Sequence, residues 1–347
     1  MACLLSVLSC TQNKTHHSVS YDTLSIPIAT TNLTDYTKKC VKGNLLVGYN
    51  HTYHSYDLYD LSILKPVGSI RLEKEGPEGV SVGTFTVFDS LIIAQDRKKL
   101  VVHSLSGEFQ YKVDIMSSEY DSLYLLPPFS FGNNTSSLTL QGTRIFFDLF
   151  ESEGFSPKYL GYFDFNEDKF YILPKGLMPY LSDKYGVLSP PDIVSIAPDK
   201  LMLSTMYSDT IFITDIENQT TNKLYLNNNT ATWKASQTGL FLGVAESGKR
   251  VFDHYITNRK HNNVCYFPKD ELYSTVVNEN PPEDMFDKSK QFLCFYDKEG
   301  NEVLSEKLSD NISPFIMKWK DNLLLQIISE DESTMKFLKV SISATEP

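Results

Sequence analysis

The sequence contains no apolar run that approaches the roughly eighteen residues needed to cross a bilayer as a helix. Cysteine is scarce and widely spaced, and no C-x-x-C pair occurs among Cys3, Cys10, Cys40, Cys265 and Cys294. This spacing argues against a structural zinc site. Cys265 and Cys294 both lie in strand-like apolar runs, which is typical of cysteines that behave as small buried hydrophobes. The sequence leaves open whether these two form a disulfide.

The common signatures of catalysis are also missing. There is no G-x-S-x-G nucleophile elbow, no P-loop, no H-E-x-x-H and no dinucleotide fingerprint. His51 and His54 form an H-x-x-H pattern, but residues three apart on a strand face opposite sides, so the pair is not suited to share a metal. Carboxylates number 43, too many to single out an acid and a base. We therefore expect no catalytic residue, no bound metal and no cofactor.

The composition indicates a folded, strand-rich and acidic protein. Hydrophobic residues make up 41% of the 347, and aromatic residues make up 12%, with 20 Tyr and 21 Phe. Aromatic side chains favour strands. The net charge of −11 repels phosphate backbones, which makes nucleic acid an unfavourable partner. The length suits one large all-β domain or two ordinary ones.

The N-terminus is apolar up to a cysteine and then turns polar. The stretch "MACLLSVLSC" resembles the end of a bacterial lipoprotein signal, in which Cys10 would be acylated, and "TQNKTHHSVS" follows it. The stretch lacks a basic segment and is short for a secretory signal, so an apolar N-terminus without a signal role is the alternative. We predict that residues 1–20 are a signal remnant and tether, and that residues 21–347 form a single domain.

A hairpin pattern recurs along the chain, made of an apolar strand, a short polar residue, a polar turn and a second strand. The copies occupy residues 56–72, 100–115, 160–173, 211–226 and 292–308. The short polar residue of each copy can bond the turn backbone, as in an Asx-turn, and is Asp60, Ser104, Asp164, Asp215 or Asp297. We interpret these five side chains as turn formers and not as metal ligands or acids.

Further strands precede each hairpin. One lies directly upstream, at residues 44–49, 89–94, 143–150, 199–206 and 263–267, and another lies before most of these, at residues 84–88, 137–140, 192–196 and 250–256. Four strands in each repeat predict the blades of a β-propeller. The chain ends one strand short of a sixth blade, with strands at 314–319, 322–328 and 335–342. We predict that residues 22–29 supply its fourth strand, closing an all-β, six-bladed propeller with four-stranded antiparallel blades.

Two segments interrupt the repeat. Residues 227–249 could hold extra strands or a crossing loop, and the acidic, Pro-containing stretch 268–291 is interpreted as a disordered segment or surface lid, with a binding role as the alternative. Between them, "DHYITNRKH" gathers charged and histidine side chains, including His254 and Arg259. If residues 250–256 form an innermost strand, these two side chains become candidates for binding at a mouth of the ring, although solvated turn residues are the other interpretation.

The link after the first hairpin, "RLEKEGPEGV", has an unusual composition. Gly76 permits a sharp turn, Pro77 stiffens the chain, and the charges of Glu73, Lys74 and Glu75 keep the link in water. A corner between blades explains the glycine and the proline. It does not explain why this one link has the Glu-Lys-Glu-Gly-Pro form, so these five residues are predicted as a contact surface.

Taken together, Cys10, the repeated hairpins, the segment 73–79 and the late blocks 250–267 and 292–308 resemble a family of Bacteroidota envelope lipoproteins, domain of unknown function 4221. The resemblance covers the chain from about Tyr21. Members often carry a Tyr-Tyr-Arg-like strand in the late block, whereas residues 264–267 read "VCYF", so a role for that arginine does not carry over. The resemblance implies a six-bladed propeller and an envelope location, but no reaction.

The expected function is a non-catalytic binding or scaffolding module of the cell envelope, for an unidentified protein, peptide or glycan. A carbohydrate-active hydrolase or lyase on the same scaffold is one alternative, and a sensor partner of a membrane regulator is another, because fold does not determine function. A monomer is expected, held at the membrane by the lipid anchor alone, in the outer membrane or the periplasm.

Overall fold

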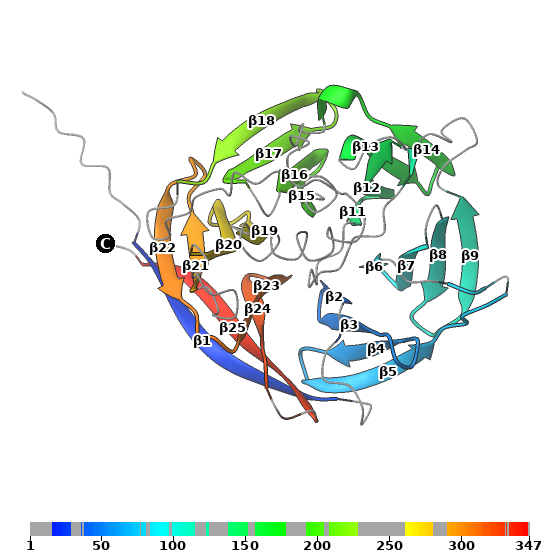
Figure 1. Cartoon of the computed structure of the whole chain (residues 1–347), viewed down its shortest axis with the longest axis horizontal. Coiled ribbons are helices and arrows are strands. Elements are labelled where there is room, and N and C mark those ends of the chain that lie inside the picture. The colour runs from blue at the N-terminus through cyan, green and yellow to red at the C-terminus, as the bar shows by residue number, and fades with distance from the viewer. Residues whose placement is uncertain are drawn as a thin grey trace, which may run out of the picture.

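The computed structural model describes residues 16–28, 36, 38–76, 78–80, 84–96, 99–114, 123–124, 138–151, 157–177, 192–204, 208–227, 261–279, 290–329, 331 and 333–345. These residues form six antiparallel sheets arranged as blades around a central axis, which confirms the predicted six-bladed β-propeller (Figure 1). In each blade the first strand lies nearest the axis and the last strand lies at the rim (Figure 1).

Blades one to three follow one another along the chain. Blade one contains β2 (Lys38–Lys42), β3 (Leu45–Asn50), β4 (Ser55–Asp60) and β5 (Lys65–Arg71). Blade two contains β6 (Thr84–Phe88), β7 (Leu91–Asp96), β8 (Lys99–Ser104) and β9 (Phe109–Asp114). In blade three the innermost place is shared by β10 (Leu123–Tyr124) and β11 (Thr139–Gln141), and β12 (Arg144–Glu151), β13 (Pro157–Asp164) and β14 (Lys169–Ile172) follow.

The remaining blades complete the ring. Blade four contains β15 (Asp192–Ala197), β16 (Lys200–Ser204), β17 (Thr210–Asp215) and β18 (Thr220–Tyr225). Blade five contains β19 (His261–Phe267), β20 (Leu272–Asn278), β21 (Gln291–Tyr296) and β22 (Glu302–Lys307). Blade six contains β23 (Ile312–Trp319), β24 (Asn322–Ile327) and β25 (Thr334–Thr345), with β1 (His16–Pro27) at its rim.

The N-terminal strand closes the ring, as the sequence predicts. β1 pairs antiparallel with β25 over its whole length, and Asp22 lies opposite Lys339 while Ile26 lies opposite Met335. The fully buried Ile26 side chain joins the apolar core between blades six and one. β1 begins at His16 and therefore includes residues 16–20, which the sequence places in the tether. Closure by the two ends of the chain hides sheet edges that would otherwise be free to pair.

The hydrophobic core is divided into six layers, one between each pair of neighbouring blades. Because side chains alternate along a strand, a middle strand contributes to two layers. Ile92 packs toward blade one while its neighbour Ile93 packs toward blade three. Strands buried on both faces read as continuous apolar runs, which is why the second strand is conspicuous in the sequence of blade two, where it reads "LIIA".

The five predicted turn formers do what the sequence indicates. The side-chain oxygen of each accepts a hydrogen bond from a backbone N–H of its own turn. The donors are Ser62 for Asp60, Glu108 for Ser104, Asn166 for Asp164, Asn218 for Asp215, and both Glu299 and Asn301 for Asp297. All five turns lie at the rim, between the third and fourth strands of blades one to five. The turn interpretation of these residues is confirmed.

Blade five corrects two predictions. Its innermost strand is His261–Phe267, although the sequence pattern assigns residues 263–267 to the second strand. Residues 250–256, predicted as the innermost strand, lie outside the described residues. Its second strand is Leu272–Asn278, inside the stretch that the sequence assigns to a loop or lid. All seven residues of that strand are buried. The acidic and Pro-rich residues around this short strand obscure its apolar pattern, so the segment that forms the first strand is predicted as the second. The third and fourth strands lie where the sequence predicts them.

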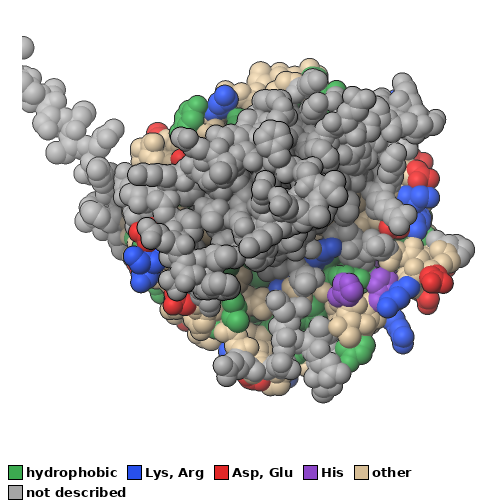
Figure 2. Space-filling view, in the orientation of Figure 1, with side chains coloured by type: hydrophobic (Ala, Val, Ile, Leu, Met, Phe, Trp, Pro, Cys, Tyr) green, Lys and Arg blue, Asp and Glu red, His purple; other side chains and the backbone are tan. Residues whose placement is uncertain are grey.

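Polar and charged side chains gather at the rim. Figure 2 shows acidic and basic side chains along the edge of one face, and the exposed ion pair Lys298–Glu271 joins two turns of blade five. In the described part of the chain the helical structure consists of the three-residue turn η2 (Lys175–Leu177), and no helix there is long and apolar enough to span a membrane.

Candidate ligand-binding cavity

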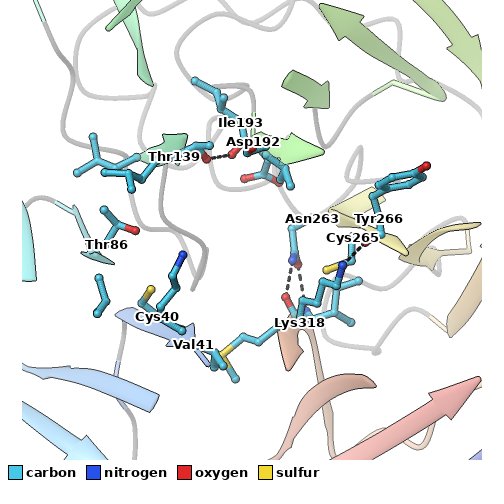
Figure 3. A pocket seen from close by; sticks show the side chains of 18 of the residues that line it. Cys40, Val41, Thr86, Thr139, Asp192, Ile193, Asn263, Cys265, Tyr266 and Lys318 are labelled. Atoms are coloured by element: carbon cyan, nitrogen blue, oxygen red, sulfur yellow. Dashed lines mark hydrogen bonds between the residues drawn. The ribbon is translucent and has the colours of Figure 1, made fainter. Parts of the chain in front are cut away.

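A cavity of about 590 Å³ lies on the axis of the ring. All six blades contribute to its wall through their innermost strands, with residues 39–43, 86–87, 138–140, 192–195, 263–266 and 316–318, together with Lys320. The cavity thus lies where six chain segments that are distant in sequence meet (Figure 3). A volume of this size is typical of pockets that hold a small organic ligand, about 300–1,000 Å³.

Polar side chains of the wall tie neighbouring blades together. Asn263 of β19 bonds the backbone of Ile316 in β23 twice: its amide nitrogen donates to the carbonyl, and its oxygen accepts from the N–H at 3.0 Å. Thr139 donates to the carbonyl of Ile193, which links blades three and four (Figure 3). Cys40 is hydrogen-bonded to the backbone of Val87, which links blades one and two. These bonds hold the wall in place, so the cavity has a preformed shape.

The two thiols of the wall are poor nucleophiles. Burial raises the pKa of Cys265 to about 12, and burial raises the pKa of Cys40 as well. Because the thiolate is the reactive form of cysteine, both side chains stay protonated and unreactive near neutral pH. Cys265 and Cys294 are free thiols, and they lie in β19 and β21 with β20 between them. The open question of a disulfide between them is thereby answered.

Charged groups are unevenly distributed around the cavity. Lys39, Lys42, Lys318 and Lys320 belong to its wall, and among the described residues Asp192 is its one carboxylate. Asp192 also raises the pKa of Asp148, a buried residue of β12, although burial is the larger cause. The pKa of Asp148 reaches about 7. Within the described residues no group of three or more histidine, cysteine or acidic side chains could hold a metal ion.

The predicted contact surface after blade one is a compact corner at its described positions. The carbonyl of Glu73 accepts from the N–H of Val80 at 3.0 Å, and Gly76, with φ +89°, accepts from Gly79 at 3.1 Å. Glu73, Lys74, Glu75 and Gly76 are exposed. They lie outside the wall of the axial cavity. The corner explanation is supported by these bonds, and the contact role stays a prediction.

The other predicted site residues lie outside the described part of the chain, namely Pro77, His254, Arg259 and Cys10. His51 and His54 do not form a metal site among the described residues, since the His54 ring bonds the Tyr49 hydroxyl at 2.7 Å and the Glu73 carbonyl at 3.2 Å.

Sequence reasoning missed the cavity lysines. A signal was available, because "KKCVKG" and "MKWKD" place lysines in or next to innermost strands. The corresponding strand of blade two reads "TFTVF" and carries no charge.

The sequence and the fold are both similar to those of one protein family. The sequence model of the family described as domain of unknown function DUF4221 matches residues 10–308. The crystal structure of a DUF4221 member from Bacteroides vulgatus is similar, with a TM-score of 0.69 and 12% identity over 95% of this chain and 99% of that chain. The crystal structure of a candidate exported protein from Bacteroides fragilis has a TM-score of 0.57 and 12% identity, over 94% and 95%. No curated protein matches the sequence. The chain belongs to the DUF4221 family.

Proposed function

We propose that this protein is a non-catalytic binding protein of the bacterial cell envelope, and that its ligand occupies the axial cavity. The observation that carries the proposal is the cavity of about 590 Å³, whose wall is built by the innermost strands of all six blades. The hydrogen bonds of Thr139 and Asn263 join four of these strands in two pairs, so little ordering is required when a ligand enters. Such preorganisation favours affinity.

The side chains of the cavity wall are better suited to binding a ligand than to catalysing its reaction. The thiols of Cys40 and Cys265 have raised pKa values and are poor nucleophiles. The side chains of Thr139 and Asn263 are engaged with the backbone of the next blade. The groups that remain include charged and apolar side chains and the hydroxyl of Tyr266, which suit recognition.

A carbohydrate-active hydrolase or lyase is the second candidate, and one observation favours it. Burial, with a smaller contribution from Asp192, raises the pKa of Asp148 to about 7. A carboxyl group with a raised pKa near a second carboxylate is an arrangement found in general acid catalysis. Asp148 is only 5% exposed and is not part of the cavity wall, which places this function second.

Blocking the cavity tests the binding proposal. Val194 lies in the wall on β15, and we expect Val194→Phe to reduce the amount of ligand retained from a fractionated envelope extract by about tenfold or more, because the larger ring fills space the ligand needs. The matched control is Val303→Phe, which makes the same change at an exposed position on the outer strand β22. Native mass spectrometry of the purified protein measures the retained ligand.

The same measurement separates the two candidate functions. Equal retention by the wild-type protein, Val194→Phe and Val303→Phe would contradict a site in the cavity. Recovery of the ligand with unchanged mass supports binding. Recovery of smaller fragments from the wild-type protein would instead support a hydrolase or lyase, and Asp148→Asn should then abolish the fragments.

The envelope location rests on Cys10 and on the similarity to a candidate exported protein. In cells grown with labelled palmitate, we expect the wild-type protein to carry the label and to sediment with membranes, because an acyl chain at Cys10 would anchor it. Cys10→Ala should lose both properties, while Cys3→Ala keeps them. Label that remains on the Cys10→Ala protein would contradict lipid attachment at this residue.

A further inference from the structure

The wall of the axial cavity is positively charged in a protein that is strongly negative. In the part of the chain that the structure describes, four lysines, Lys39, Lys42, Lys318 and Lys320, line it together with the single carboxylate of Asp192. The chain as a whole has a net charge of −11. A cluster of one sign inside a cavity with low-dielectric walls creates a local potential that the net charge of the protein does not cancel.

The lysines are grouped on one side of the cavity. Lys39 and Lys42 belong to β2 of blade one, whereas Lys318 belongs to β23 of blade six and Lys320 follows that strand. Blades one and six are neighbours only because β1 closes the ring. In Figure 3, Lys318 and Asp192 lie on different sides of the opening. Ring closure therefore assembles a cationic arc from two ends of the sequence.

The ammonium group of Lys318 is only partly compensated. It donates to the carbonyl of Tyr266 at 2.5 Å and lies 5.2 Å from the centre of the Phe267 ring. Burial lowers the pKa of Lys318, which shows that its charge is partly desolvated. Elsewhere lysines pair with carboxylates, as Lys269 does with Asp321 at 2.5 Å.

Three of the arc lysines form no close ion pair in the described part of the chain, although Asp321 acts on Lys318 and Lys320 acts on Asp60 from a greater distance. Lys42, Lys318 and Lys320 form no ion pair within 4.0 Å there. An ammonium group is a compact charge with three donors that can turn toward an anion. A negatively charged ligand would neutralise the positive charge of these ammonium groups, and a neutral ligand would not.

The rest of the wall indicates how the ligand is recognised. Its aromatic side chain is Tyr266, and its remaining members are mostly small or aliphatic. Stacking on aromatic faces therefore contributes little, and charge has to provide most of the selectivity. The volume of about 590 Å³ admits a molecule of monosaccharide size or somewhat larger.

We propose that the axial cavity binds a small organic anion, with its carboxylate or phosphate group held by Lys42, Lys318 and Lys320. This inference rests on the proposed binding function and specifies the class of ligand. The phosphate and carboxylate sources share one chemistry, that of an oxyanion accepting hydrogen bonds from ammonium groups.

Calorimetric titration with three probes tests the proposal on the full chain. Galacturonate carries a carboxylate, galactose is its neutral counterpart, and inorganic phosphate represents the other source of oxyanion. We expect galacturonate or phosphate to bind, and galactose to bind about tenfold more weakly or worse, because only the anions gain Coulomb energy in the cavity. Raising the salt concentration should weaken anion binding.

Lysine variants locate the site. Lys318→Gln should weaken binding of the bound anion by about tenfold or more, and the triple change of Lys42, Lys318 and Lys320 to Gln should abolish it. The matched control is Lys223→Gln on the outer strand β18, which removes the same charge at an exposed position and should change the affinity less than about twofold. Circular dichroism confirms that each variant is folded.

Several results would overturn the inference. They are galactose binding as tightly as galacturonate, the triple variant keeping its affinity, or neither anion binding at millimolar concentration. In each of these cases loss of extract ligand in Val194→Phe would still support the proposed function. Conversely, anion binding that depends on the three lysines, combined with unchanged retention of extract ligand in Val194→Phe, would leave the anion site standing and contradict the proposed function.

Discussion

Replacing Asp57 with alanine is expected to lower the free energy of unfolding by about 3–5 kcal/mol. Asp57 lies in β4 of blade one and is fully buried. Its Oδ2 accepts from the Tyr36 hydroxyl at 2.8 Å and from the Asn50 amide at 3.1 Å, and its Oδ1 accepts from Ser69 at 2.7 Å and Ser55 at 3.3 Å. Alanine removes both acceptor oxygens and all four hydrogen bonds at once, and it deprives the buried donors Tyr36, Asn50 and Ser55 of this partner.

The effect of Asp57 should extend to closure of the ring. Tyr36 lies between the closing strand β1 and the first inner strand β2, and its hydroxyl also bonds that of Tyr59 at 2.5 Å. The Tyr36 ring packs against Gly48 so closely that an added Cβ there would lie 2.6 Å from it. Asp57 therefore holds Tyr36, which packs in the apolar core between blades six and one.

Urea unfolding followed by tyrosine fluorescence measures the loss. The control is Asp60→Ala, which removes a carboxylate of the same strand that bonds only its own exposed turn, and it should cost much less. A double-mutant cycle with Tyr36→Phe should show coupling of about 1 kcal/mol or more, because both residues belong to one network. Additive losses, or an Asp57→Ala protein as stable as the Asp60→Ala control, would contradict this account.

Asp148→Asn is expected to stabilise the protein at pH 8 and to have little effect at pH 4. Burial, with a smaller contribution from Asp192, raises the pKa of Asp148 from 3.8 to about 7 in the folded state. A raised pKa means that the folded state binds the proton more tightly than the unfolded chain does. The stability contributed by this group is present in full below pH 3.8 and is lost as the pH rises toward 7.

The size of the effect follows from the interval between the two pKa values of Asp148, which are 3.8 in the unfolded chain and about 7 in the folded state. Each pH unit between the two pKa values costs the wild-type protein about 1.4 kcal/mol, or about 4 kcal/mol over the whole interval. Asparagine carries no charge, and its side-chain oxygen can still accept the hydrogen bond that Asp148 receives from its own backbone.

Unfolding free energies measured from pH 4 to pH 8 check this prediction. The wild-type curve should fall relative to that of Asp148→Asn as the pH rises, and the difference should level off above pH 7. Asp270→Asn, an exposed change in the β19–β20 turn, is the control and should run parallel to the wild type. Parallel curves for Asp148→Asn as well would contradict the raised pKa.

Much of the fold could be predicted from local patterns. The rim hairpins were visible because Asp60, Asp164 and their equivalents fix turns through bonds to their own backbone, which requires no distant partner. The closing strand was predictable because the sixth blade lacked one strand and the N-terminus offered an unpaired one. These signals lie within a few residues of one another or follow from counting repeats.

Blade five shows where local patterns fail. The strand Leu272–Asn278 is buried, yet charged and Pro-containing residues lie on either side of it in the sequence. Composition averaged over the segment therefore indicated a loop. Only pairing with β19 and β21 distinguishes this strand from its surroundings, and pairing partners are not visible within a short window.

The sequence by itself determined the strand-rich repeat, the number of blades, the turn chemistry and the absence of common catalytic signatures. Only the tertiary structure decided which side chains meet at the axis. Lys42 and Lys318 are separated by most of the chain, and they come together because β1 joins β25 and makes blades one and six neighbours. Closure of the propeller places residues from the two ends of the sequence side by side in the wall of one cavity. No short stretch of the sequence indicates that contact.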